Sequence, residues 1–406
     1  MGSSFRWLSA VCLVLGLGGD GWAQEPETRA DQLRRQREEK ARNLEPPEQS
    51  GMERWLLRLE QGRLFERLLN PPEGFYPKIG NITAGSGFAA GPGYRRSRLF
   101  GGPVDLSAFG AFSTMRYWIM EGRLRMPRLA NERVAVDVYG RRSDYRHEPF
   151  YGIGQDSQRN NETFYALKNT AVGGGVTFAP QPWLLFGGST EWFQPNVRGI
   201  DDDTSIEDVF NLIQAPGLGA QPRFLRHAAT AEVNYREPRG NPRRGGRYAV
   251  AFQKFVDRDQ GRYSFDRVEI DLQQYVPIVR DRRTLALRAH GSLVPDESAI
   301  VPFYLQRTLG GPDDLRGFRR FRFRDENLLL LQAEYRWEIF TAVDGAIFYD
   351  AGTVASRPSE LSLGNMDSDY GIGFRFGTLN GIFLRIEGAF GSREGKHFIL
   401  RYGHVF

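Results

Sequence analysis

From about residue 76 onward, hydrophobic and polar residues alternate along the chain with a period of two. The clearest of these ladders lie at residues 118–126, 267–273, 285–293 and 329–339. Because successive side chains of a strand point to opposite faces, each ladder predicts a β-strand with charge on one face and apolar or aromatic residues on the other. The fold class is therefore all-β.

The connections between the strands alternate in length, which favours one architecture. Short turns are expected at 127–131, 180–181, 238–244, 277–281 and 378–380, and longer polar loops at 147–161, 195–222, 295–326 and 354–369. The alternation of residues alone also fits a soluble sandwich, whose charged faces would look outward. Short turns at one end and long loops at the other are typical of a transmembrane antiparallel β-barrel, here of about 16 strands with five after the loop 295–326.

The C-terminus is itself predicted to be a strand. Its last residues place Phe398, Leu400, Tyr402 and Phe406 on one face, with His404 between the last two. A terminal aromatic residue on an alternating strand is typical of a C-terminal assembly motif of outer-membrane proteins. The partner expected for it is the cellular barrel-assembly machinery.

The N-terminal part of the chain has a different pattern. Arg6, an apolar run over 11–17 and small residues before Gln24 predict a signal peptide over residues 1–23. Residues 24–75 are expected to form a charged linker and a short amphipathic helix, after which 76–406 form the barrel. The helix could lie on a membrane surface, dock against a partner, or plug the barrel.

Composition excludes several classes of protein. With 25% charged residues, the chain has no room for a helical membrane protein, and 40% hydrophobic with 13% aromatic residues is too apolar for disorder. The single cysteine, Cys12, lies in the predicted signal peptide, so a disulfide scaffold is not expected. A net charge of +5 without a binding motif gives no argument for nucleic acid.

The sequence predicts no catalytic, cofactor or metal site. The five histidines follow no spacing that would pair one of them with a nucleophile, so the chain is not expected to be an enzyme. Acidic residues at 201–203, 207 and 208 could hold a divalent cation, although a solvated acidic loop is the simpler interpretation.

Two motifs in the C-terminal third stand out. The long loop 295–326 contains Leu315-Arg316-Gly317-Phe318, followed by four arginines at 319, 320, 322 and 324. Two strands later come Phe348, Asp350 and Gly352, spaced as Phe-x-Asp-x-Gly. A loop this long is uncommon unless it is functional or disordered.

These motifs resemble those of the BamA/TamA superfamily of outer-membrane assembly and translocation barrels, also called the bacterial surface antigen family. The resemblance covers residues 76–406 and implies that Arg316, at the tip of the sixth outer loop, folds back into the barrel lumen. There it would meet Asp350 and the acidic residue of strand twelve, which Glu334 matches by its position. A guanidinium fork suits a carboxylate, and Gly317 would let the backbone turn tightly beside it.

The resemblance also implies a location and a function. It places the chain in the lipid of the bacterial outer membrane and suggests assembly of outer-membrane proteins, or translocation of a protein or other client, through a lateral seam between the first and last strands. Glycines at 80, 85, 87 and 91 would weaken the first strand or simply accommodate curvature. The chain departs from the pattern of this family before the barrel. Residues 24–75 are too few for a POTRA domain, the module of about seventy-five residues that recruits clients in this family. A passive anion-biased pore or receptor, or a structural barrel without transport, remain as alternatives.

Overall fold

The computed structural model describes residues 73–83, 85–279, 282–340, 343–378 and 381–401. The predicted signal peptide, almost all of the segment 24–75 expected to form the charged linker and the amphipathic helix, and the last residues of the chain, including Tyr402 and Phe406, lie outside the described residues. The barrel begins two residues before the predicted position 76, because the first strand starts at Gly74. None of the helices in the described part combines the length and apolar composition needed to cross a bilayer.

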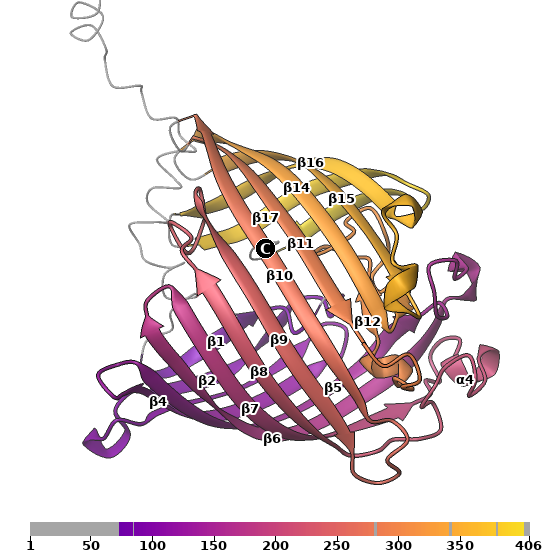
Figure 1. The fold of residues 1–406 in the computed structure, drawn as a ribbon, viewed down its shortest axis with the longest axis horizontal. Coiled ribbons are helices and arrows are strands. Elements are labelled where there is room, and N and C mark those ends of the chain that lie inside the picture. The colour runs from indigo at the N-terminus through magenta and orange to yellow at the C-terminus, as the bar shows by residue number, and fades with distance from the viewer. Residues whose placement is uncertain (1–72, 84, 280–281, 341–342, 379–380, 402–406) are drawn as a thin grey trace, which may run out of the picture. The chain divides into compact units, whose positions relative to one another are not determined.

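Sixteen strands form one antiparallel sheet in which the neighbours follow chain order from β1 to β18 (Figure 1). The strands are β1 (Gly74–Gly80), β2 (Ala89–Arg96), β3 (Asp105–Ser113), β4 (Trp118–Leu129), β5 (Val134–Phe150), β6 (Thr163–Gln181), β7 (Leu184–Arg198), β8 (Phe224–Asn234), β9 (Gly245–Asp257), β10 (Phe265–Val279), β11 (Arg283–Leu293), β14 (Asn327–Phe340), β15 (Val343–Ala355), β16 (Asp367–Thr378), β17 (Gly381–Ser392) and β18 (Gly395–Arg401). The predicted all-β fold, its strand number and the five strands after the long loop are confirmed.

The turns and loops fall on the two ends of the sheet as the sequence indicates. The end that carries the loops 151–162, 199–223, 294–326 and 356–366 is called the outer end below. The turn between β17 and β18, at Arg393 and Glu394, also lies at this end, because the strands alternate in direction.

Burial in the sheet is inverted relative to a soluble protein. Charged side chains that point inward are almost fully buried, namely Arg267, Glu334, Arg336, Asp350, Arg375, Arg385 and Glu387. Apolar side chains on the opposite face of the strands are exposed, among them Val172, Val250, Phe252, Ile347, Ile372 and Phe374. An apolar outer face around a charged interior is the arrangement of a transmembrane β-barrel, in which lipid covers the outside.

The loop 294–326 contains secondary structure of its own. A 3-10 helix, η3 (Phe303–Leu305), precedes a small hairpin of β12 (Arg307–Leu309) and β13 (Phe323–Asp325). The hairpin pairs the two sides of the loop and leaves residues 310–322 as its tip. The three-residue strands are too short for their period to be detected in the sequence.

Candidate functional site: the lumen loop and the seam

Arg316, at the tip of the long loop, lies fully buried among carboxylates of the barrel wall. Its Nε donates to Asp350 Oδ2 at 2.7 Å and its Nη2 to Asp350 Oδ1 at 2.9 Å, so the contact uses both nitrogens of the fork. Its Nη1 donates to Glu334 and to Glu387, each at 3.2 Å. One guanidinium thus connects strands β14, β15 and β17.

The wall supplies further charges that the sequence analysis missed. Arg336, Arg375 and Arg385 share the carboxylates of Glu334 and Glu387 with Arg316. These residues occupy inward positions of β14, β16 and β17, and the same period of two that predicts the strands also places them on the charged face. Nothing in the sequence pairs them with the tip of the loop, because that contact depends on how the loop folds.

The Phe-x-Asp-x-Gly motif has a physical explanation in the alternation of β15. Residues 348, 350 and 352 all face the lumen, since they are two apart on one strand. The guanidinium of Arg316 lies 3.3 Å from the ring centroid of Phe348 and binds Asp350. A Cβ on Gly352 would lie 2.8 Å from Leu309, so this glycine makes room for the loop.

Gly317 serves a different purpose from the one the sequence suggests. Its φ lies outside the left-handed region, so the tight turn does not require glycine. The constraint is space, because a Cβ at this position would lie 2.5 Å from Cβ of Asp369 and 3.2 Å from Cβ of Ser392. Glycine therefore allows the loop backbone to approach β16 and β17 closely.

Substitution of this glycine tests the close approach. We expect Gly317→Ala to lower the free energy of unfolding by about 1–3 kcal/mol, the usual cost of overpacking a filled site. Gly364→Ala, in the loop 356–366, is the matched control, because its nearest neighbour would be Ser362 Oγ at 3.6 Å. Urea unfolding of the refolded barrel measures both, and equal stability of the two variants would contradict this account.

The neighbours of Arg316 in the motif anchor the loop by apolar contacts and hydrogen bonds. Leu315 and Phe318 are buried in a cluster with Leu309, Phe323, Leu328, Leu330 and Val354. Asp314 Oδ1 accepts hydrogen bonds from the backbone N–H groups of Gly310 and Leu315, at 3.0 and 2.8 Å. The tip is therefore held on both sides of Arg316.

Burial also changes the electrostatics of the loop. Desolvation, with the nearby Asp313 as a second cause, raises the pKa of Asp314 to about 7. Desolvation alone would lower the pKa of Arg316, but Asp350, Glu387 and Glu334 together hold it above the usual value. A guanidinium keeps its charge in proteins, so the burial of Arg316 depends on its carboxylate partners.

The first and last strands are the second feature of this region. Each pairs with its neighbour in the chain, β1 with β2 and β18 with β17, and in the part of the barrel that the structure describes no backbone ladder joins β1 to β18. This boundary between β1 and β18 is called the seam below. The glycines beside it include Gly91, where a Cβ would lie 1.9 Å from the carbonyl oxygen of Gly110, so close strand contact is reason enough for glycine there.

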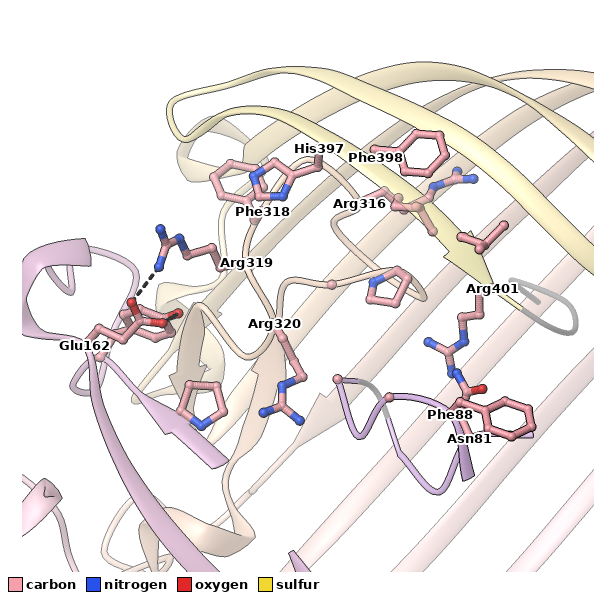
Figure 2. Close-up of a pocket in the computed structure, with 18 of the residues that line it drawn as sticks. Asn81, Phe88, Glu162, Arg316, Phe318, Arg319, Arg320, His397, Phe398 and Arg401 are labelled. Atoms are coloured by element: carbon pink, nitrogen blue, oxygen red, sulfur yellow. Dashed lines mark hydrogen bonds and ion pairs between the residues drawn. The ribbon is translucent and has the colours of Figure 1, made fainter. Parts of the chain in front are cut away.

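A cavity of about 700 Å³ lies at the seam. Asn81 and Phe88 line it from the N-terminal side, and residues 397–401 of β18 line it from the other side (Figure 2). The tip of the loop, including Arg316, Phe318 and Arg319, forms part of the same lining. On β18, Phe398 and Leu400 of the expected assembly motif are exposed.

The acidic residues at 201–208 are not assembled as a metal site. Asp208 accepts from the backbone of Ser205 at the start of the short helix α4 (Ile206–Val209), and Asp203 accepts from Thr204. In the part of the chain that the structure describes, no group of three or more histidine, cysteine or acidic side chains could hold a metal ion.

Comparison with known proteins identifies the family. The model of the Omp85 superfamily domain matches residues 99–394. The chain belongs to the Omp85 superfamily. This confirms the resemblance inferred from the loop motif and the Phe-x-Asp-x-Gly motif, and the match includes both of them.

This Omp85 barrel also superposes on solved structures. BamA from Haemophilus ducreyi lacking POTRA domains 1–3 superposes with a TM-score of 0.61 at 15% identity, covering 82% of this chain and 69% of that one. CdiB from Acinetobacter baumannii superposes with a TM-score of 0.52 at 12% identity, and CdiB from Escherichia coli with a TM-score of 0.54 at 13% identity. Each match covers 81% of this chain, and 59% and 61%, respectively, of the two CdiB chains. No curated protein sequence matches this chain. At these identities the likeness concerns the fold.

Proposed function

We propose that this chain resides in the bacterial outer membrane and assembles outer-membrane proteins, or translocates a protein or other client, through the seam between β1 and β18. The observation that carries the proposal is that the outer edges of the first and last strands form no ladder in the described residues, with a cavity between β18 and the loop that follows β1. Lipid is the expected surrounding of the apolar outer face.

The chemistry of an open strand edge supports this function. An edge strand presents a row of free N–H and C=O groups, which an extended segment of another chain can pair with by β-augmentation. Ordinary β-sheet proteins cover or disrupt such edges. Two strand edges left without a ladder in the described residues therefore favour a function that uses them. The proposed client is therefore a segment able to adopt an extended conformation.

In this proposal Arg316 locks the loop 294–326 in the lumen through Asp350, Glu334 and Glu387. The same loop tip lines the cavity at the seam. Locking the loop would fix the inner wall of the site that receives the client. The roles of Leu315, Gly317 and Phe318 are to seat the tip, and those of Phe348 and Gly352 to accommodate it.

Depletion of the chain in its host tests this function. We expect a defined set of outer-membrane or secreted proteins to fall several-fold when the chain is depleted, measured by quantitative proteomics of the outer-membrane fraction and the medium. Restoring the intact chain should restore them. An unchanged protein composition after depletion would contradict the proposal.

The passive anion-biased pore is less well supported. The four arginines after the motif have partners: Arg319 binds Glu162, Arg320 binds Glu148, Arg322 binds Glu394, and Arg324 donates to the carbonyl of Phe303. Charges engaged in this way attract mobile anions weakly. A large, steady, anion-selective current in planar bilayers would nevertheless favour the pore, and would also count against a lumen filled by the loop.

A further inference from the structure

The arginines that follow the loop motif connect two parts of the barrel that are far apart in the sheet. On one side is the turn between β17 and β18, next to the seam. On the other side are β5 and the loops 81–88 and 151–162, which belong to the N-terminal strands. In the sheet these parts are linked only by way of the strands from β7 to β16, so a contact between them spans the seam.

Glu394 is the anchor on the C-terminal side. Its Oε2 accepts a hydrogen bond from the backbone N–H of Arg319 at 3.1 Å, and its Oε1 accepts one from Nε of Arg322. The side chains of Glu394 and Arg322 are almost fully buried, 2% and 3% exposed. Glu394 itself is fixed by its backbone N–H, which donates to Ser392 Oγ.

The same arginines reach the N-terminal side. Arg322 donates from Nη1 to Ser157 Oγ at 2.8 Å and from Nη2 to the carbonyl of Ser157 at 2.6 Å. Arg319 Nη1 binds Glu162 at 2.5 Å, the contact drawn in Figure 2. Arg319 and Arg322 therefore each bind residues on both sides of the seam.

Arg320 extends the contact to β5 and to the loop between β1 and β2. Its guanidinium binds Glu148 at 3.3 Å and donates to the carbonyl of His147 at 2.7 Å, both on β5. It also packs against Gly85 in the loop between β1 and β2, where a Cβ would lie 2.7 Å from the guanidinium carbon. A larger residue at 85 would displace it.

From these contacts we propose that Arg319, Arg320 and Arg322 form a staple that holds the outer end of the seam closed, with Glu394 and Glu148 as its two anchors. Buried charged hydrogen bonds of this kind replace the missing backbone ladder at that end. The staple continues directly from Arg316, so withdrawal of the loop tip would release both. This inference rests on the proposed function, because a staple regulates the chain only if the seam opens.

Distances across the seam test the staple. In the full chain with Cys12→Ser, spin labels on Asn81→Cys and Phe398→Cys, which line the cavity from its two sides, report the outer end of the seam. Labels on Val250→Cys and Ile270→Cys, which are opposite each other on β9 and β10, report a paired part of the sheet. The barrel is placed in phosphatidylethanolamine and phosphatidylglycerol vesicles, and double electron–electron resonance gives the distance distributions. We expect Glu394→Gln to broaden the outer-end distribution and shift it to longer distances by several ångströms, with little change in the distance between β9 and β10.

Controls separate the staple from general damage. Glu148→Gln, on the opposite anchor, should give the same change as Glu394→Gln, whereas Glu297→Gln, whose exposed carboxylate pairs with Arg357 at 3.8 Å, should give none. Outer-end distances that remain unchanged in both anchor variants, or equal shifts at both pairs of labels, would overturn the staple. These outcomes are independent of the proposed function, which fails instead if client assembly survives depletion.

Discussion

Replacing Arg316 with alanine is expected to lower the free energy of unfolding of the barrel by about 3–5 kcal/mol, the cost of breaking a buried ion pair from one side. The loss arises because Asp350, Glu334 and Glu387 stay buried when their shared cation is removed. Urea unfolding followed by tryptophan fluorescence measures it. The loop should also become accessible to protease, since Arg316 connects its tip to three strands.

Three further variants make this result specific. Arg316→Lys keeps the charge but not the two-nitrogen fork, so an intermediate loss is expected. Arg316→Ala with Asp350→Asn should recover part of the loss, because one stranded carboxylate is removed. Arg357→Ala, which breaks an exposed pair at 3.8 Å, should cost at most about 1 kcal/mol. If Arg316→Ala costs no more than Arg357→Ala, Arg316 does not lock the loop.

The barrel could be predicted from the sequence because its determinants are local. The period of two along each strand fixes which residues face the lumen, and turn residues fix where strands end. Both survive in a single sequence without knowledge of the partners. The same local pattern puts Glu334 on the charged face of its strand, whereas the lumen position of Asp350 is implied by the family resemblance. The structure brings both carboxylates to Arg316.

The remaining contacts could not be predicted, for reasons that are equally physical. Glu387 and Glu394 contact the loop only because the loop folds back across β17 and its turn, a placement set by long-range packing. Gly317 is required by the approach of Asp369, which lies on a distant strand. The alternation of residues cannot report such contacts, since it says which face a side chain occupies and not what lies opposite.

The arginine run shows why a cluster of charges in a sequence does not by itself indicate a function. In the sequence it suggests a positive lumen. In the fold, Arg319, Arg320 and Arg322 each reach a carboxylate, and two of them reach both sides of the seam. The charges therefore serve to join surfaces and leave little net attraction for anions.

Locking the seam tests the central claim most directly. A cysteine pair across the seam, Asn81→Cys directly after β1 with Phe398→Cys in β18, both on the lining of the cavity, is cross-linked by a bifunctional maleimide in cells that carry no other copy of the chain. The matched control is Val250→Cys with Ile270→Cys, opposite each other on the paired strands β9 and β10. Cross-linking β1 to β18 should deplete the same outer-membrane or secreted proteins as loss of the chain, and the control cross-link should have no effect. Normal levels of those proteins in cells with a fully cross-linked seam would contradict the account.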